Sequence, residues 1–161
     1  MRTAYLDAVK LVERMHRQFL EVVKTELDRL WIKDINNVQS LILFNIGEDE
    51  LTVGELTNRG YYLGSNVSYN VRKMVEAGYL VQERSPHDRR SIRVRLSEKG
   101  LQLCRQMTVM FDRHAAGFAR DPGITSKLND ASAIFRNLER YWSEMLDFGG
   151  RFRPAEDAEE A

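Results

Sequence analysis

Residues 51–100 of the chain are LTVGELTNRGYYLGSNVSYNVRKMVEAGYLVQERSPHDRRSIRVRLSEKG. Near the start, Thr52 is followed three residues later by Glu55, and this spacing is typical of the capping box that begins a helix. A second start signal at Ser65 opens a longer helix, which is expected to end at Gly78. The stretch therefore predicts two short helices in succession.

The second half of the same stretch predicts a hairpin. Residues 79–84 and 91–96 have strand-like composition, and the second segment alternates apolar and charged side chains. The polar sequence Ser-Pro-His-Asp-Arg-Arg at 85–90 separates them as a turn. Two helices followed by a small β-wing of two or three strands form a winged helix-turn-helix, which is a shape that holds DNA.

Further helices are expected on both sides of this lobe. Apolar residues recur every three or four positions over 5–22 and 101–118, and a shorter, nearly buried helix is predicted over 38–46. We therefore expect a mainly α fold in which a small β-wing is the only sheet.

The last predicted helix carries an apolar seam with the a/d spacing of helices that pack against a partner. The seam consists of Leu128, Ala131, Phe135, Leu138, Trp142 and Met145. The predicted organisation is dimerisation helices at 1–30 and 122–148, a DNA-binding lobe at 34–100, a connecting helix at 97–120, and an acidic flexible tail at 149–161.

The composition is that of a soluble globular protein, with 161 residues of which 43% are hydrophobic and 30% charged. No run approaches the ~18 apolar residues that a membrane helix requires, and residues 1–15 lack the apolar stretch of a signal peptide. The protein is therefore expected to stay in the cytoplasm and to have no membrane partner. A lone Cys104 excludes an intrachain disulfide and a cysteine-built zinc site.

The formal net charge is zero, but the charges are segregated along the chain. Nine basic and five acidic residues lie between Gly54 and Gly100, so this part carries a net charge of +4 and the remainder −4. A basic lobe is the electrostatic signature that a nucleic-acid-binding surface requires.

A helix that enters the major groove needs short polar side chains near its N-terminus and longer donors further along for phosphates. The helix opening at Ser65 meets both requirements. Its candidate DNA contacts are Ser65, Asn66, Ser68, Tyr69 and Asn70 for bases, and Arg72 and Lys73 for phosphates. An ordinary polar helix face is the alternative interpretation.

The predicted wing turn adds three candidate DNA-binding residues. From such a turn Arg89 and Arg90 project outward, toward a DNA backbone or into a minor groove. Asp88 would cost affinity there unless it orients a neighbouring arginine, so we assign it a positioning role. A solvated charged turn is the alternative.

Five short motifs of this region together resemble the MarR family of winged-helix transcription regulators. They are Leu51-Thr52-Val53-Gly54-Glu55-Leu56, Ser65-Asn66-Val67-Ser68, Glu76-Ala77-Gly78-Tyr79-Leu80-Val81, Asp88-Arg89-Arg90 and Leu96-Ser97-Glu98-Lys99-Gly100. The region that contains them, residues 51–100, is about a third of the chain. Within the resemblance, Tyr69 stands where the family commonly has an arginine, and Asn70 where it commonly has an apolar residue.

The resemblance implies a homodimer whose first and last helices interlock and whose two lobes read a pseudo-palindromic operator on double-stranded DNA. The side chains expected at the dimer interface are Tyr5, Val12, Leu128, Phe135, Leu138, Trp142 and Met145. It also implies that Arg90 reaches the minor groove, that Asp88 holds the wing, and that Arg89 lies near phosphate. We expect a repressor, because the chain has no separate region for recruiting polymerase.

In the family, small aromatic ligands often bind between the dimer helices and the DNA lobe. In this chain His16, Phe19, Trp31 and Phe44 are candidates to line such an effector pocket, and simple core packing is the alternative for each. Cys104 is expected to be structural rather than a redox sensor, since it lies on an apolar helix face.

No motif for catalysis was found, so we expect neither an enzyme nor a cofactor or metal site. The sequence lacks ligand-spaced histidines or cysteines, a glycine-rich phosphate loop and a nucleophile elbow. The competing function is a winged-helix module that binds other proteins without DNA specificity. The arginines of the wing argue against it, because a protein-docking wing is expected to be more apolar.

Overall fold

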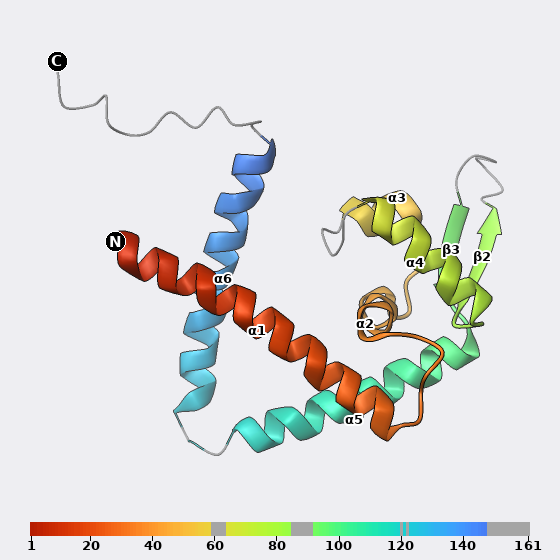
Figure 1. Ribbon diagram of the computed structural model, residues 1–161, viewed down its shortest axis with the longest axis horizontal. Coiled ribbons are helices and arrows are strands. Elements are labelled where there is room, and N and C mark those ends of the chain that lie inside the picture. Colours follow the sequence, from red (N-terminus) through yellow and green to blue (C-terminus); the bar gives the residue numbers. More distant parts are fainter. Residues whose placement is uncertain (59–63, 85–91, 120, 122, 148–161) are drawn as a thin grey trace. The chain divides into compact units, whose positions relative to one another are not determined.

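The computed structural model describes residues 1–58, 64–84, 92–119, 121 and 123–147. The order of elements is α1 (Arg2–Arg29), α2 (Asn37–Ile46), β1 (Leu51–Thr52), α3 (Val53–Asn58), α4 (Gly64–Glu76), β2 (Leu80–Arg84), β3 (Ile92–Leu96), α5 (Glu98–Phe118) and α6 (Ile124–Asp147). The expected mainly α fold with a small β-wing is confirmed (Figure 1).

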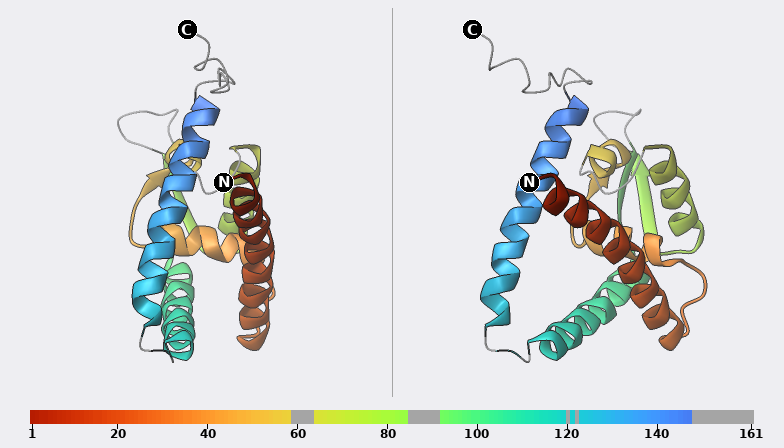
Figure 2. Two further views of the ribbon diagram at one scale, coloured as in Figure 1. Left: turned by 90° about the vertical axis from the view of Figure 1, so that its left-hand side faces the viewer. Right: turned by 60° about the vertical axis from the view of Figure 1, so that its left-hand side comes forward.

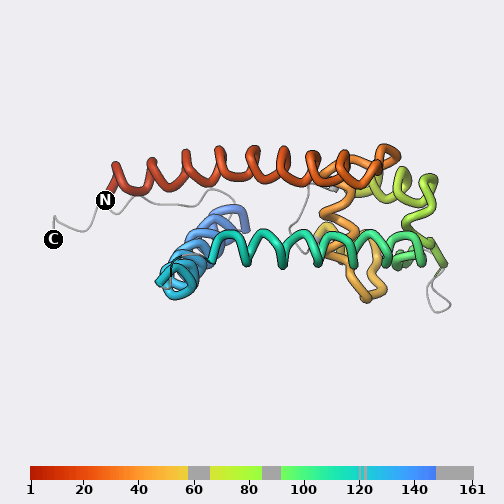
Figure 3. The backbone as a smooth tube through the Cα atoms, turned by 90° about the horizontal axis from the view of Figure 1, so that it is seen from below, coloured from red at the N-terminus to blue at the C-terminus, as the bar shows by residue number. Residues whose placement is uncertain are grey.

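The chain divides into two compact units, residues 1–112 and 113–161. The first unit contains α1, a single uninterrupted helix (Figure 3), and the whole of the lobe built from α2, α3, α4 and the sheet. The second unit contains α6, and none of the residues of this helix is buried.

Two helices, α3 and α2, begin with a capping box, and the box of α3 is the one that the sequence predicts. The Thr52 N–H donates to Glu55 Oε2 at 2.6 Å, and the Glu55 N–H donates to Thr52 Oγ1 at 3.1 Å. At the start of α2, Asn36 Oδ1 accepts from the Gln39 N–H at 2.8 Å and the Asn36 N–H donates to Gln39 Oε1 at 3.0 Å. In each capping box two backbone N–H groups donate to side-chain oxygens. Both helix starts are therefore stabilised by residues that are close together in the chain.

The sheet is antiparallel, with strand order β1-β3-β2. In its register Leu51 pairs with Val94, and Leu80 pairs with Leu96. Figures 1 and 2 show α3, α4 and the strands grouped in one lobe, with α4 beside β2 and β3. The short β1 makes the wing three-stranded, since the two residues before α3 pair with β3.

The lobe and α1 share one hydrophobic core. Its most buried members, each at most 5% exposed, come from α1, α2, α3, α4, the strands and α5, and are Val23, Leu27, Ile42, Leu43, Ile46, Leu51, Leu56, Val67, Val71, Met74, Tyr79, Leu80, Val94, Leu96, Leu103 and Met107. Because α4 contributes three of these side chains, its orientation is tied to the core of the lobe.

The end of α4 is joined to the start of α5 by three hydrogen bonds to successive backbone carbonyls. Lys99 Nζ donates to the Ala77 carbonyl at 2.9 Å, and Ser97 Oγ donates to the Gly78 carbonyl at 2.7 Å. The Ser97 N–H donates to the Tyr79 carbonyl at 2.9 Å. These bonds satisfy carbonyls that would otherwise be left over where a helix ends.

A carboxylate from the loop after α1 closes over the same junction. Asp34 accepts hydrogen bonds from the Tyr79 hydroxyl at 2.9 Å and from Lys99 Nζ at 2.5 Å. Partial burial would raise the pKa of Asp34, but the hydrogen bonds from Lys99 and Tyr79 outweigh it, so this pKa is lowered. The junction of α4 with α5 is therefore also tied to the end of α1.

Candidate nucleic-acid interface

The helix α4 has a buried face and an exposed face. Val67, Val71 and Met74 are between 0% and 4% exposed and attach the helix to the core. The opposite face is exposed and carries Asn66, Ser68, Tyr69, Arg72 and Lys73. The structure thus places five of the predicted DNA contacts together on one accessible helix face. Ser65 lies in the first turn of the same helix.

The cations of α4 are paired with a carboxylate one turn further along. Lys73 Nζ lies 2.8 Å from Glu76 Oε2, and Arg72 Nε lies 3.9 Å from Glu76 Oε1. The hydrogen bond from Lys73 lowers the pKa of Glu76, and the same bond raises the pKa of Lys73. On DNA these cations would therefore exchange Glu76 for phosphate oxygens, so Glu76 competes with DNA for both of them.

Tyr69 and Arg72 form a second contact on the exposed face. The guanidinium carbon of Arg72 lies 5.7 Å from the centre of the Tyr69 ring, within the range of a cation–π interaction. Tyr69 is 53% exposed. A large, partly apolar surface is therefore held next to a cation at the centre of the predicted reading face.

The prediction that Asn70 reads bases is wrong for this fold. Its side chain is only 9% exposed, and both ends of the amide are engaged inside the lobe. Asn70 Nδ2 donates to the Asn66 carbonyl at 2.9 Å, and Asn70 Oδ1 accepts from Gln39 Nε2 at 3.2 Å. Helical periodicity is the physical reason, since Asn70 shares the buried face with Val67, Val71 and Met74.

The wing residues Asp88, Arg89 and Arg90 lie outside the described residues, so their predicted roles stay predictions. The described strands end at the pair Arg84 and Ile92, which brackets that segment. Two arginines of β3 are paired: Arg95 Nη2 lies 2.9 Å from Glu83 Oε1, and Arg93 Nη1 lies 3.8 Å from Glu50 Oε1.

The four residues predicted to line an effector pocket lie in different surroundings. Trp31 follows α1 with a φ of 59° and is 81% exposed, and His16 is also exposed. Phe19 and Phe44 both pack against Phe111, with ring centroids 6.2 Å and 5.0 Å away. Phe19 and Phe44 thus belong to a three-ring cluster joining α1, α2 and α5, and the effector pocket stays a prediction.

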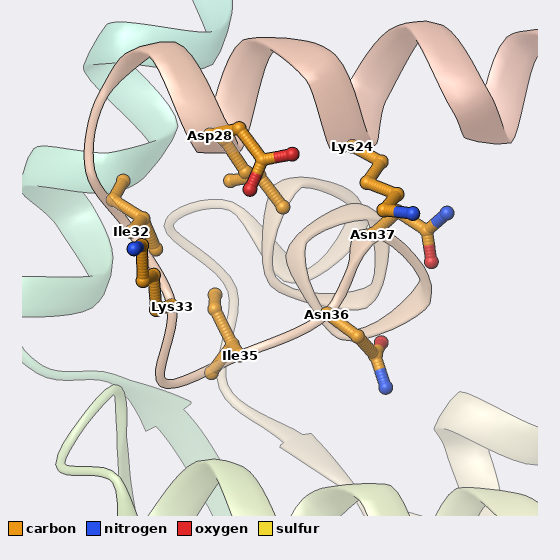
Figure 4. A pocket seen from close by; sticks show the side chains of 8 residues that line it. Lys24, Asp28, Ile32, Lys33, Ile35, Asn36 and Asn37 are labelled. Carbon is orange, nitrogen blue, oxygen red and sulfur yellow. The ribbon is translucent and has the colours of Figure 1, made fainter.

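A shallow cleft of about 260 Å³ does lie at the end of α1, but none of the four predicted residues lines it (Figure 4). Its lining comes from α1, the following loop and the start of α2, and consists of Lys24, Leu27, Asp28, Ile32, Lys33, Ile35, Asn36 and Asn37. Asn36 and Asn37 are engaged in the structure: Asn36 caps α2, and Asn37 Nδ2 donates to the Leu20 carbonyl at 2.8 Å.

Cys104 on α5 is half-buried, as its place on an apolar helix face predicts. Burial raises the pKa of its thiol to about 11, against a smaller opposite effect of Arg105. Since the thiolate is the reactive form, a raised pKa leaves the thiol poorly reactive at neutral pH. This environment favours the structural interpretation of Cys104 over a redox sensor.

We expect Cys104 in the folded protein to react with a chromogenic disulfide reagent much more slowly at pH 7 than in the urea-unfolded protein. The rate should rise about tenfold per pH unit from pH 7 to pH 10, because the thiolate fraction rises in that proportion below the pKa. Since the chain contains one cysteine, the absorbance reports this thiol alone. A rate that levels off near pH 8 would contradict the raised pKa.

Among the described residues, no helix is both long and apolar enough to cross a membrane. Within the same residues, no group of three or more histidine, cysteine or acidic side chains is placed to hold a metal ion.

Comparison with protein families and curated proteins gives two matches. Residues 33–91 match the family model described as MarR family. Over 145 residues the chain is 36% identical to the exopolysaccharide II synthesis transcriptional activator ExpG of Rhizobium meliloti (strain 1021). That match covers 90% of this chain and 75% of the relative.

Solved structures share the fold at low sequence identity. Streptococcus pneumoniae FabT in complex with DNA has a TM-score of 0.68 and 17% identity, covering 85% of this chain and 99% of FabT. The S. aureus MepR–DNA complex has a TM-score of 0.65 and 19% identity, covering 84% of this chain and 96% of MepR. The likeness therefore extends well beyond the lobe, into the terminal helices.

Proposed function

Because this chain belongs to the MarR family of transcriptional regulators, we propose that it binds double-stranded DNA sequence-specifically, with α4 as the helix in the major groove. One observation carries the proposal: α4 is held to the core by three apolar side chains while Asn66, Ser68 and Tyr69 stand exposed beside two cations. Short polar groups can approach base edges, and the cations further along the helix are placed for phosphates. The DNA complexes of FabT and MepR, which share the fold, support this arrangement.

A homodimer acting on a pseudo-palindromic operator is part of the proposal. The seam of α6 supports it, because this long helix has an apolar stripe but no buried residue within its own chain. Phe135 is 38%, Met145 40% and Leu128 50% exposed, and a second copy of the chain would cover them. On α1, Tyr5 at 38% exposed and the half-buried Val12 are the predicted contributors.

The sign of regulation follows from where the operator lies relative to the promoter. The prediction of a repressor stays a prediction, and the name of the curated relative, a transcriptional activator, favours activation. A promoter fusion measured with and without the protein gives the sign directly. Release from the operator by a small aromatic ligand likewise stays a prediction.

We further propose that the protein acts without catalysis and without a cofactor, in the cytoplasm, where its DNA target lies. The alternative, a winged-helix module that binds proteins, is disfavoured by the exposed face of α4. That face offers short polar side chains and cations, whereas protein interfaces are enriched in aromatic and apolar groups at their centre. Tyr69 is the one aromatic residue among these exposed side chains, and its ring is in cation–π contact with Arg72.

Two substitutions on α4 test the proposal by separating base contacts from phosphate contacts. Asn66→Ala is expected to relax base preference at one position of each half-site, by about 1–3 kcal/mol of discrimination. Arg72→Ala is expected to weaken binding to all sequences alike and to lower the salt slope of log Kd by about one. Operators selected from a random DNA pool, then measured by fluorescence anisotropy across salt concentrations, give both quantities.

The variants Asn66→Ala and Arg72→Ala can also contradict the proposal. If neither variant changed affinity or specificity, α4 would not be the reading helix. If the wild type selected no sequence at all in dilute buffer, the protein-binding alternative would be preferred.

A further inference from the structure

A line of hydrogen bonds crosses the lobe from the start of α2 to the reading face of α4. It begins at the Asn36 N–H, which donates to Gln39 Oε1 at 3.0 Å. The other end of the same amide, Gln39 Nε2, donates to Asn70 Oδ1 at 3.2 Å. Asn70 Nδ2 then donates to the carbonyl of Asn66 at 2.9 Å. Each amide is therefore used at both ends.

The central pair of this line is buried in apolar surroundings. Gln39 is 7% and Asn70 9% exposed, and the neighbours of Asn70 on α4 include Val67 and Val71 at 1% and 4%. Amides in such a place are costly unless both ends find partners. Apolar side chains can pack in several closely related arrangements, whereas an amide pair is satisfied in one relative placement of the two helices.

We infer that Gln39 and Asn70 form a positioning pair that sets the rotation and height of α4 at which Asn66 meets the bases. The inference rests on the proposed function and deepens it, because it assigns sequence discrimination to two residues that do not touch DNA. Asn66 connects the buried pair to the DNA contacts. Its side chain is exposed on the reading face, and its backbone carbonyl accepts the hydrogen bond from Asn70 Nδ2. A shift of α4 would move this side chain relative to a base edge.

Phosphate contacts should depend much less on this pair. Arg72 and Lys73 have long, flexible side chains that are 67% and 44% exposed, and these can follow a small displacement of the helix. Base-edge hydrogen bonds have short, directional geometry and cannot. Loss of the pair should therefore reduce discrimination between sequences while non-specific binding is retained.

The experiment uses the full chain in four forms: wild type, Asn70→Leu, the double variant Gln39→Leu with Asn70→Leu, and the control Val71→Ala. The single change leaves a buried amide end without its partner, whereas the double change removes both amides. Val71→Ala opens a small cavity on the same helix face and lowers stability without touching the pair. Urea unfolding gives the stability of each form.

For each form, the Kd is measured for the selected operator and for an unrelated duplex, at several salt concentrations. We expect the ratio of the two Kd values to fall about tenfold or more in both leucine variants, with the salt slope unchanged. The double variant should recover only part of the stability that Asn70→Leu loses, because the Asn36 N–H then lacks its Gln39 acceptor, and it should not recover the ratio. Val71→Ala should lose stability and keep the ratio.

Two results would overturn the inference: an unchanged ratio in the double variant, or an equal loss of the ratio in Val71→Ala, which would make it a consequence of stability alone. A wild type with no sequence preference would instead overturn the proposed function, and the inference with it. The two failures are thus told apart by the wild-type measurement.

Discussion

Gly100→Ala is expected to lower the free energy of unfolding by about 3 kcal/mol, the upper part of the range for overpacking a core. A Cβ at this position would lie far inside contact distance of the Tyr79 carbonyl oxygen, and 3.1 Å from Cδ2 of Leu96. The clashing carbonyl is backbone and is itself held by the Ser97 N–H at 2.9 Å. The first turn of α5 would have to move away from the end of α4.

The measurement is urea unfolding followed by circular dichroism, with Gly117→Ala as the matched control. Gly117 lies in the same helix, and a Cβ there would meet nothing within 4 Å. Because alanine favours a helix over glycine, the control should be neutral or more stable by about 0.5–1 kcal/mol. Equal effects of the two substitutions would show that α5 does not approach the Tyr79 carbonyl closely.

Leu138→Asp is expected to convert the proposed dimer into monomers and to weaken operator binding by about a hundredfold or more. The change places a carboxylate in the middle of the α6 seam, where a buried, unpaired charge is strongly unfavourable. Two lobes joined in a dimer bind with an avidity of about 10²–10⁴ over one lobe, and the monomer loses that gain. Sedimentation velocity gives the association state, and fluorescence anisotropy gives the Kd.

Ala133→Asp provides the control on the same helix. Ala133 is exposed, and the helical repeat places it on the side opposite the seam. This variant should sediment and bind DNA like the wild type, although it carries the same added charge. A Leu138→Asp protein that still sediments as a dimer would show that the interface lies elsewhere.

Much of the fold could be predicted from residues that are close together in the chain. The Thr52 and Glu55 spacing marks the start of α3, and the Gly78 that follows α4 has the positive φ of 78° that favours glycine. Apolar repeats of three and four residues correctly indicate the long helices. Such signals are local, because capping and periodicity involve neighbours within one or two turns.

The candidate site could be predicted only in part. The polar composition of residues 66–73 predicts an exposed helix face. It does not predict which of these polar side chains is exposed and which is buried. Asn70 has the same polarity as Asn66, and its burial depends on Gln39, which is 31 positions away. The spacing of Asn36 and Gln39 as a capping pair could have drawn attention to Gln39, although not to its partner.

The amino-acid sequence alone determined where helices begin and end, which region is basic, and which helix carries the exposed polar and cationic face proposed to read DNA. The tertiary structure alone decided which polar side chain of α4 turns inward, why a glycine stands at position 100, and that Phe19 and Phe44 both pack against Phe111 while Trp31 is exposed. The physical reason is the separation along the chain of the residues that interact. Capping, periodicity and charge are properties of neighbouring residues, whereas a buried amide pair or a close backbone approach exists only when distant segments pack together.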